Sequence, residues 1–196
     1  MKFTFLVAST LILIAGCSKQ PEPAVQTAAA PVTKQTPETP TYPADYKIDQ
    51  PIPQSSIKTE LALVGAPVYQ AKNDILQFTV QVTNAGKAPL VTAGTAPVVM
   101  AINLAGPEGV DKPPGKRLVG RASLPLIVEG TKGEVKASIP AASILGQTLR
   151  VELFQEGIGF FGRRYNQPTL DVGAFQRCKG AAATLCDVSG TAVATK

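Results

Sequence analysis

Few side chains in this sequence of 196 residues could do chemistry, because it holds three cysteines and no histidine. Without histidine it cannot form a Ser-His-Asp triad, a Cys-His dyad or a histidine-ligated zinc or haem site. Three cysteines are too few for a four-thiolate zinc or iron–sulfur site. Glu129, Glu134 and Glu152 are separate carboxylates whose spacing sets up no acid–base pair. We therefore predict no catalytic residue, no metal and no cofactor.

The first cysteine, Cys17, follows a segment typical of an export signal. Residues 3–15 form a mostly apolar run after a positive start, and the run is shorter than the roughly 20 residues that span a bilayer. It ends in Ile14-Ala15-Gly16-Cys17, which resembles the lipobox of bacterial lipoproteins. The resemblance implies a diacylglycerol thioether on Cys17, cleavage before it and acylation of the new amino terminus, with residues 1–16 as the signal peptide.

A lipid on Cys17 makes the membrane the first expected partner. Three acyl chains exceed the two signals needed for stable anchoring. Ser18 follows the cysteine, where aspartate would resemble an inner-membrane retention signal, so the resemblance implies the outer membrane with the chain facing the periplasm. The alternative is an ordinary secretory signal that contains a cysteine by chance.

The charge pattern gives no indication of nucleic-acid binding. Removal of residues 1–16 leaves 18 basic and 14 acidic side chains, a net charge of +4. The basic side chains are scattered, with the densest runs at Lys112, Lys116 and Arg117 and at Arg163-Arg164, and no basic helix carries interleaved aromatics. We expect no nucleic-acid partner and a mild attraction to anionic lipid or glycan.

The other two cysteines, Cys178 and Cys186, enclose seven residues near the end of the sequence. Two thiols this close pair readily in an oxidising compartment. A metal site would need more ligands, and a redox dithiol usually has two residues between its cysteines. We predict a structural disulfide that staples residues 177–196, with a small polar tail from Asp187 onward that frays.

Residues 17–56 have the composition of a tether. Eight of the 17 prolines lie here, and no apolar period of 2 or 3.6 persists. So few large apolar side chains cannot offset the entropy of ordering, so we expect a disordered spacer with polyproline II character. The alternative is that Tyr42-Pro43-Ala44-Asp45-Tyr46 docks on a partner or back on the domain.

Residues 57–176 instead have the pattern of short strands separated by glycine and proline. The clearest is Ile75–Asn84, where large apolar side chains alternate with polar ones before a turn at Asn84–Lys87. A short helical turn is expected at Pro140–Leu145 and a loop at Gly106–Gly115. The other expected strands are Ile57–Val64, Pro97–Leu104, Lys116–Ser123, Leu124–Glu129, Glu134–Ile139, Thr148–Gln155 and Thr169–Phe175. This spacing predicts an all-β, immunoglobulin-like antiparallel β-sandwich, with an open barrel as the lesser option.

Two motifs within this region add a family resemblance. Arg121-Ala122-Ser123-Leu124-Pro125 and the stretch from Gln155-Glu156-Gly157 to Phe160-Phe161 are similar to an R-x-x-L-P strand and a Q-E-G-h-x-W-F hairpin, where h is apolar. Both occur in immunoglobulin-like modules found beside bacterial glycan-handling enzymes. Phe160 stands where that family has tryptophan, the better platform for stacking a sugar.

The segment around the second motif holds the candidate contact residues. Phe160, Phe161, Arg163, Arg164 and Tyr165 gather three aromatic and two cationic side chains in six positions, a composition typical of interface hot spots and ligand platforms. The alternative is that Phe160 and Phe161 close one end of the sandwich while the arginines are solvated.

Together these patterns predict a membrane-anchored lipoprotein whose β-sandwich is a non-catalytic binding or scaffold module for an envelope protein. The alternative from another class is a glycan-binding module for cell-wall or exported polysaccharide, in which Phe160 and Tyr165 would stack on sugar rings. An enzyme is not expected, because no motif supports catalysis.

Overall fold

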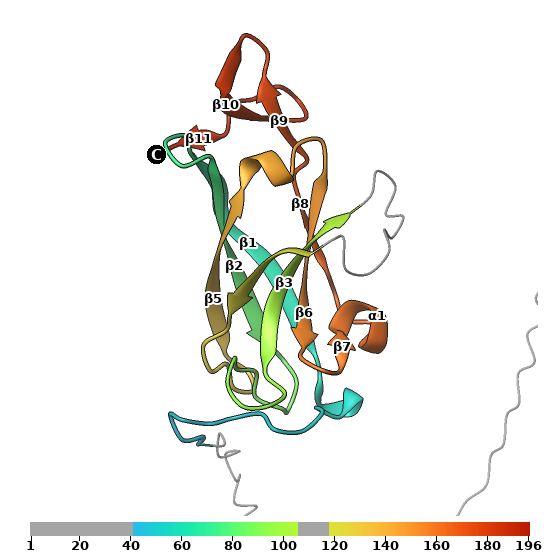
Figure 1. The fold of residues 1–196 in the computed structure, drawn as a ribbon. Coiled ribbons are helices and arrows are strands. Elements are labelled where there is room, and N and C mark those ends of the chain that lie inside the picture. The colour runs from blue at the N-terminus through green and yellow to red at the C-terminus, as the bar shows by residue number, and fades with distance from the viewer. Residues whose placement is uncertain (1–40, 106–117) are drawn as a thin grey trace, which may run out of the picture. The chain divides into compact units, whose positions relative to one another are not determined.

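The segment Ile75–Asn84, in which apolar and polar side chains alternate, forms a central strand, β2, of a two-layered sandwich (Figure 1). The computed structural model describes residues 41–105 and 118–196, which belong to one compact unit, Glu38–Lys196. Cys17 with its preceding segment, the tether up to residue 40, and the loop with Lys112, Lys116 and Arg117 lie outside the described residues. No helix in the described part of the chain is long and apolar enough to cross a membrane.

The first sheet has the strand order β11-β1-β2-β5. Neighbours are antiparallel except β11, which runs parallel to β1. Period-2 alternation turns the apolar side of β2 inward, so that Leu76, Phe78, Val80 and Val82 are buried as predicted. The strands that flank β2 in this sheet are β1 (Thr59–Gln70) and β5 (Lys132–Pro140), and β11 (Ala194–Thr195) pairs with the other edge of β1.

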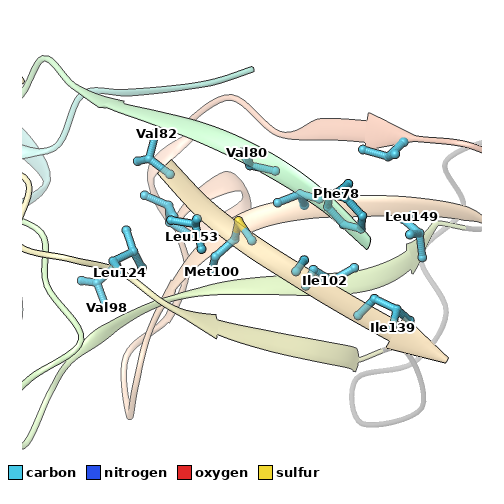
Figure 2. Close-up of a cluster of buried hydrophobic side chains, with 14 of the residues drawn as sticks. Phe78, Val80, Val82, Val98, Met100, Ile102, Leu124, Ile139, Leu149 and Leu153 are labelled. Atoms are coloured by element: carbon cyan, nitrogen blue, oxygen red, sulfur yellow. The ribbon is translucent and has the colours of Figure 1, made fainter. Parts of the chain in front are cut away.

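The second sheet has the order β4-β3-β6-β7, and β8 also pairs with β6. Its central strands place Met100, Ile102, Leu149 and Leu153 against the first sheet, forming the core shown in Figure 2. The strands are β3 (Val98–Ala105), β4 (Leu118–Ser123), β6 (Thr148–Gln155), β7 (Gly159–Phe160) and β8 (Leu170–Val172). The expected all-β sandwich is confirmed.

The remaining elements lie toward the two ends of the sandwich. A short helix, α1 (Phe161–Tyr165), follows β7, and a hairpin of β9 (Phe175–Cys178) and β10 (Ala181–Asp187) lies at the other end (Figure 1). Two 3-10 turns, η1 (Gln54–Ser56) and η2 (Ala141–Ser143), precede β1 and β6. The second of these lies inside the turn expected at Pro140–Leu145.

The ordered body begins well before the expected boundary at residue 56. Residues 46–57, which we call the strap, bury Ile48 and Ile52 in the core. Ile48 pairs by backbone hydrogen bonds of 2.9 Å with Ala93 and Ala96, so its order comes from long-range partners rather than from a local pattern. Tyr46 also packs against the core, as expected if this segment docks back on the domain.

Three element predictions are wrong. Leu124–Glu129 is no strand and keeps a single bridge, between Ile127 and Leu90, because proline at 125 has no N–H to donate. Thr169–Phe175 divides into β8 and β9 at Gly173, whose φ is 91°. The tail does not fray: Ala194–Thr195 pairs with β1, and the backbone N–H of Lys196 donates to the Tyr69 carbonyl at 3.1 Å.

Candidate functional site

The five predicted contact residues are divided by α1 into a buried pair and an exposed set. Phe161 and Tyr165 are only 1% and 9% exposed, and their rings meet edge to face with centroids 5.5 Å apart. They lie four residues apart, on one face of the helix. These two side chains therefore belong to the core and are corrected from contact residues to anchors of α1.

The exposed set continues across the outer face of the second sheet. The guanidinium of Arg163 lies over the Phe160 ring at 5.9 Å, and the Phe160 ring is 4.7 Å from that of Phe154. The guanidinium of Arg121 lies over the Phe154 ring, 5.5 Å from its centroid. Such cation–π contacts fix the direction of long cationic side chains. We call Arg121, Phe154, Phe160, Arg163 and Arg164 the arginine–aromatic face.

The helix that presents this face is held at its far end by polar contacts. Asn166 ends α1 in the left-handed conformation with φ of 52°. The side-chain oxygen of Gln167 then accepts the backbone N–H of Thr59, at the start of β1, at 2.9 Å. Since both anchoring rings are buried as well, α1 is fixed to both sheets and holds Arg163 and Arg164 in place.

A polar pocket of about 290 Å³ lies beside α1, over β3 and β6. Glu152 lines it, with only 4% of its surface exposed, and its Oε1 accepts the Asn103 amide at 3.2 Å. Arg150 also lines it and donates two hydrogen bonds, of 2.8 and 2.9 Å, to Asp171 of β8. The pocket thus places a buried carboxylate among amide and guanidinium donors.

The two motifs that carry the family resemblance contact each other in the folded chain, and several of their polar side chains stabilise the fold. Arg121 forms an ion pair with Glu156, which joins the first motif to the second. Gln155 is fully buried, and its side-chain oxygen accepts the Ile52 N–H at 3.1 Å. Its side-chain nitrogen donates to the carbonyls of Gln50 and Ala96, both at 2.9 Å. These contacts fasten the strap to β6 and give Gln155 a structural role.

Sequence reasoning missed the residues that complete the site on the sheet. Asn103 and Phe154 face outward from β3 and β6, and Gln167 lies beyond α1. A signal was present for one strand, because Arg150, Glu152 and Phe154 alternate along it and must share a face. Nothing in the local sequence indicated that α1 would cover that face.

A second polar cluster joins the C-terminal hairpin to the sandwich. The hydroxyl of Tyr69 donates to Asp74 Oδ1 at 2.7 Å, and Arg177 of β9 donates to both groups, at 2.8 and 2.6 Å. The tyrosine hydroxyl and then the guanidinium hold the pKa of Asp74 below its ordinary value of 3.8. Since each group has its partner inside the cluster, we assign it a structural role.

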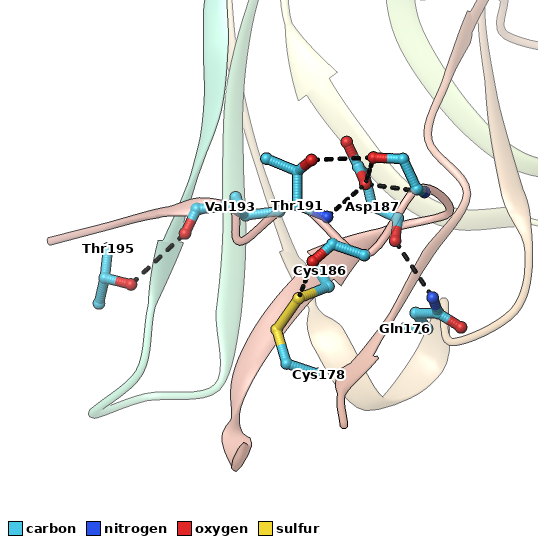
Figure 3. Close-up of a disulfide and its surroundings, with 9 residues drawn as sticks. Gln176, Cys178, Cys186, Asp187, Thr191, Val193 and Thr195 are labelled. Atoms are coloured by element: carbon cyan, nitrogen blue, oxygen red, sulfur yellow. Dashed lines mark hydrogen bonds between the residues drawn. A yellow bond between two sulfur atoms is a disulfide. The ribbon is translucent and has the colours of Figure 1, made fainter. Parts of the chain in front are cut away.

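The predicted disulfide is present in that hairpin. Cys178 and Cys186 are joined across β9 and β10, with Cα atoms 5.1 Å apart (Figure 3). Gln176 donates across the same hairpin to the carbonyl of Asp187 at 3.2 Å. Among the residues that the structure describes, no group of three or more acidic, cysteine or histidine side chains is placed to hold a metal ion.

The chain matches no protein-family model and no curated protein. Similar solved structures include the β-glucosidase from Listeria innocua in complex with glucose, with 12% identity over 59% of this chain and 16% of that chain, at a TM-score of 0.32. β-Glucosidase 3B from Thermotoga neapolitana in complex with glycerol has 16% identity over 61% of this chain and 16% of that chain, also at 0.32. The matched part is less than a fifth of either enzyme, and we transfer no activity from them.

Proposed function

We propose that this protein is a non-catalytic binding module that a lipid on Cys17 anchors to the outer membrane, facing the periplasm. Its arginine–aromatic face captures an envelope protein that carries an acidic surface. The observation that supports this most is the division of α1, in which two buried aromatic side chains fix a helix whose two arginines are exposed. Fixed cations lose little entropy on binding, and arginine is enriched at interface hot spots.

The polar pocket beside α1 favours a second candidate function, the binding of glycan. The stacking expected from Tyr165 does not contribute, because that ring is buried. Phe160 is half-buried and is the part of the predicted sugar platform that still reaches the surface.

Partner capture is tested by crosslinking in cells, extraction of the native protein in detergent and mass spectrometry of what is recovered. The variant R163A/R164A should abolish capture and leave the melting temperature nearly unchanged, because both side chains are exposed. The matched control is K132A/K136A, which removes two exposed cations from β5 in the opposite sheet.

Equal loss of capture in both variants would mean that only net charge matters, and unchanged capture in R163A/R164A would exclude α1 as the contact. A large fall in melting temperature would make the two arginines structural. The same spectra report the mass of the peptide that contains Cys17, and an unacylated cysteine there would overturn the anchoring part of the proposal.

A further inference from the structure

The pocket beside α1 has the size and lining of a site for a small polar ligand. Its volume of about 290 Å³ lies at the lower end of the range for ligand sites. Besides Glu152 and the two arginines, it is lined by the amides of Asn103 and Gln167 and by Thr169. Amide and hydroxyl side chains both donate and accept hydrogen bonds, as the hydroxyl groups of a sugar do.

The charges around the pocket nearly cancel. Arg150 is neutralised by its two hydrogen bonds to Asp171 on the neighbouring strand. The carboxylate of Glu152 and the guanidinium of Arg163 then contribute one charge of each sign to the lining. This balance favours a neutral ligand. The carboxylate would repel an anion, and the guanidinium would repel a cation.

Gly162 of α1 leaves the carboxylate of Glu152 room beneath the helix. A Cβ at Gly162 would come within 2.8 Å of Glu152 Oε2 and 2.9 Å of the Thr169 methyl group. The other carboxylate oxygen accepts the amide of Asn103, which orients the group. A carboxylate held in this way forms strong, charge-assisted hydrogen bonds with hydroxyl donors.

We infer that this pocket binds one neutral, hydroxyl-rich sugar residue, whose hydroxyl groups donate to Glu152 and accept from the surrounding amides. This inference rests on the second candidate function, and the pocket shares Arg163 with the face proposed for protein capture. It differs from stacking on Phe160, because the pocket recognises hydroxyl groups rather than a ring face.

The test titrates the mature protein in detergent micelles with maltose, cellobiose and N,N′-diacetylchitobiose at millimolar concentrations. Binding is followed by calorimetry and by the NMR signals of the side-chain amides of Asn103 and Gln167. At least one probe should bind saturably and shift both amides. Binding should persist in about 0.5 M salt, where exposed charges are screened beyond a few ångströms.

Two variants connect the binding to the pocket. Glu152→Gln keeps the shape and loses the charge, so affinity should fall about tenfold, because a charge-assisted hydrogen bond becomes a neutral one. Gly162→Ala should abolish binding by displacing the carboxylate and the Thr169 methyl group. Gln77→Ala, on the outer face of the opposite sheet, is the control that leaves affinity unchanged.

Absence of saturable binding by all three probes would overturn the inference. So would binding that neither Glu152→Gln nor Gly162→Ala weakens while both variants keep the wild-type melting temperature. Binding of dextran sulfate alone, lost in salt, would identify the region as a general anion-binding surface instead. Protein capture is scored separately, so its failure and the failure of sugar binding can be told apart.

Discussion

Replacing Gln155 by alanine should loosen the strap and lower stability more than any exposed Gln→Ala change. The side chain makes three hydrogen bonds of 2.9 to 3.1 Å while fully buried, two of them to the strap and one to Ala96. At about 1 kcal/mol net for each bond, the free energy of unfolding should fall by about 3 kcal/mol. For a body of this size that corresponds to a fall of roughly 6–12 °C in melting temperature.

The assay is urea unfolding, together with hydrogen exchange of the Ile52 N–H, whose side-chain acceptor is Gln155 Oε1. The matched control is Gln176→Ala, which removes one exposed hydrogen bond and should change stability by less than about 0.5 kcal/mol. If Gln155→Ala is as mild as the control, or the exchange rate of Ile52 is unchanged, the reasoning that this side chain fastens the strap is refuted.

Three further changes have expected outcomes. Replacing Cys178 and Cys186 by serine should lower the free energy of unfolding by about 2.5 kcal/mol for so short a loop, as urea titration of both forms would show; an equally stable serine variant would contradict this. The lowered pKa of Asp74 gives stability that is present above pH 3.8 and lost as the pH falls through its folded-state value. Asp74→Asn should therefore show a smaller loss of stability than wild type between about pH 5 and pH 2, and parallel pH profiles would be the contrary result. Gly94→Ala should destabilise the fold by more than about 2 kcal/mol, because φ there is 99° and the new Cβ would overlap the Ile48 carbonyl; wild-type thermal unfolding would exclude this close approach.

Local pattern was enough to predict the strands in which every second side chain is apolar. β2 and β6 have their expected bounds because alternation is a property of consecutive residues. The strap could not be predicted in that way, because the partner that orders Ile52 is Gln155, 103 positions along the chain. The same holds for β11, whose parallel pairing with β1 depends on the chain returning from the hairpin.

The candidate site was predicted only in part, for a related reason. The sequence indicated the segment from Phe160 to Tyr165 as a candidate, because aromatic and cationic side chains are concentrated there. Which of them are buried depends on a helix that is only five residues long, too short to give a clear period. The pocket needs Asn103 and Glu152 from neighbouring strands, and their registry exists only in the folded sheet.

The strap and the disulfide hairpin lie at opposite ends of the described body (Figure 1). Between them β1 runs from the end of the strap to the hairpin side, and its twelve residues span about 40 Å. Because Gln167 bonds to the first residue of β1, α1 lies toward the strap end. A partner bound at α1 would therefore lie toward the strap end of the described body, about the length of β1 away from the stapled hairpin.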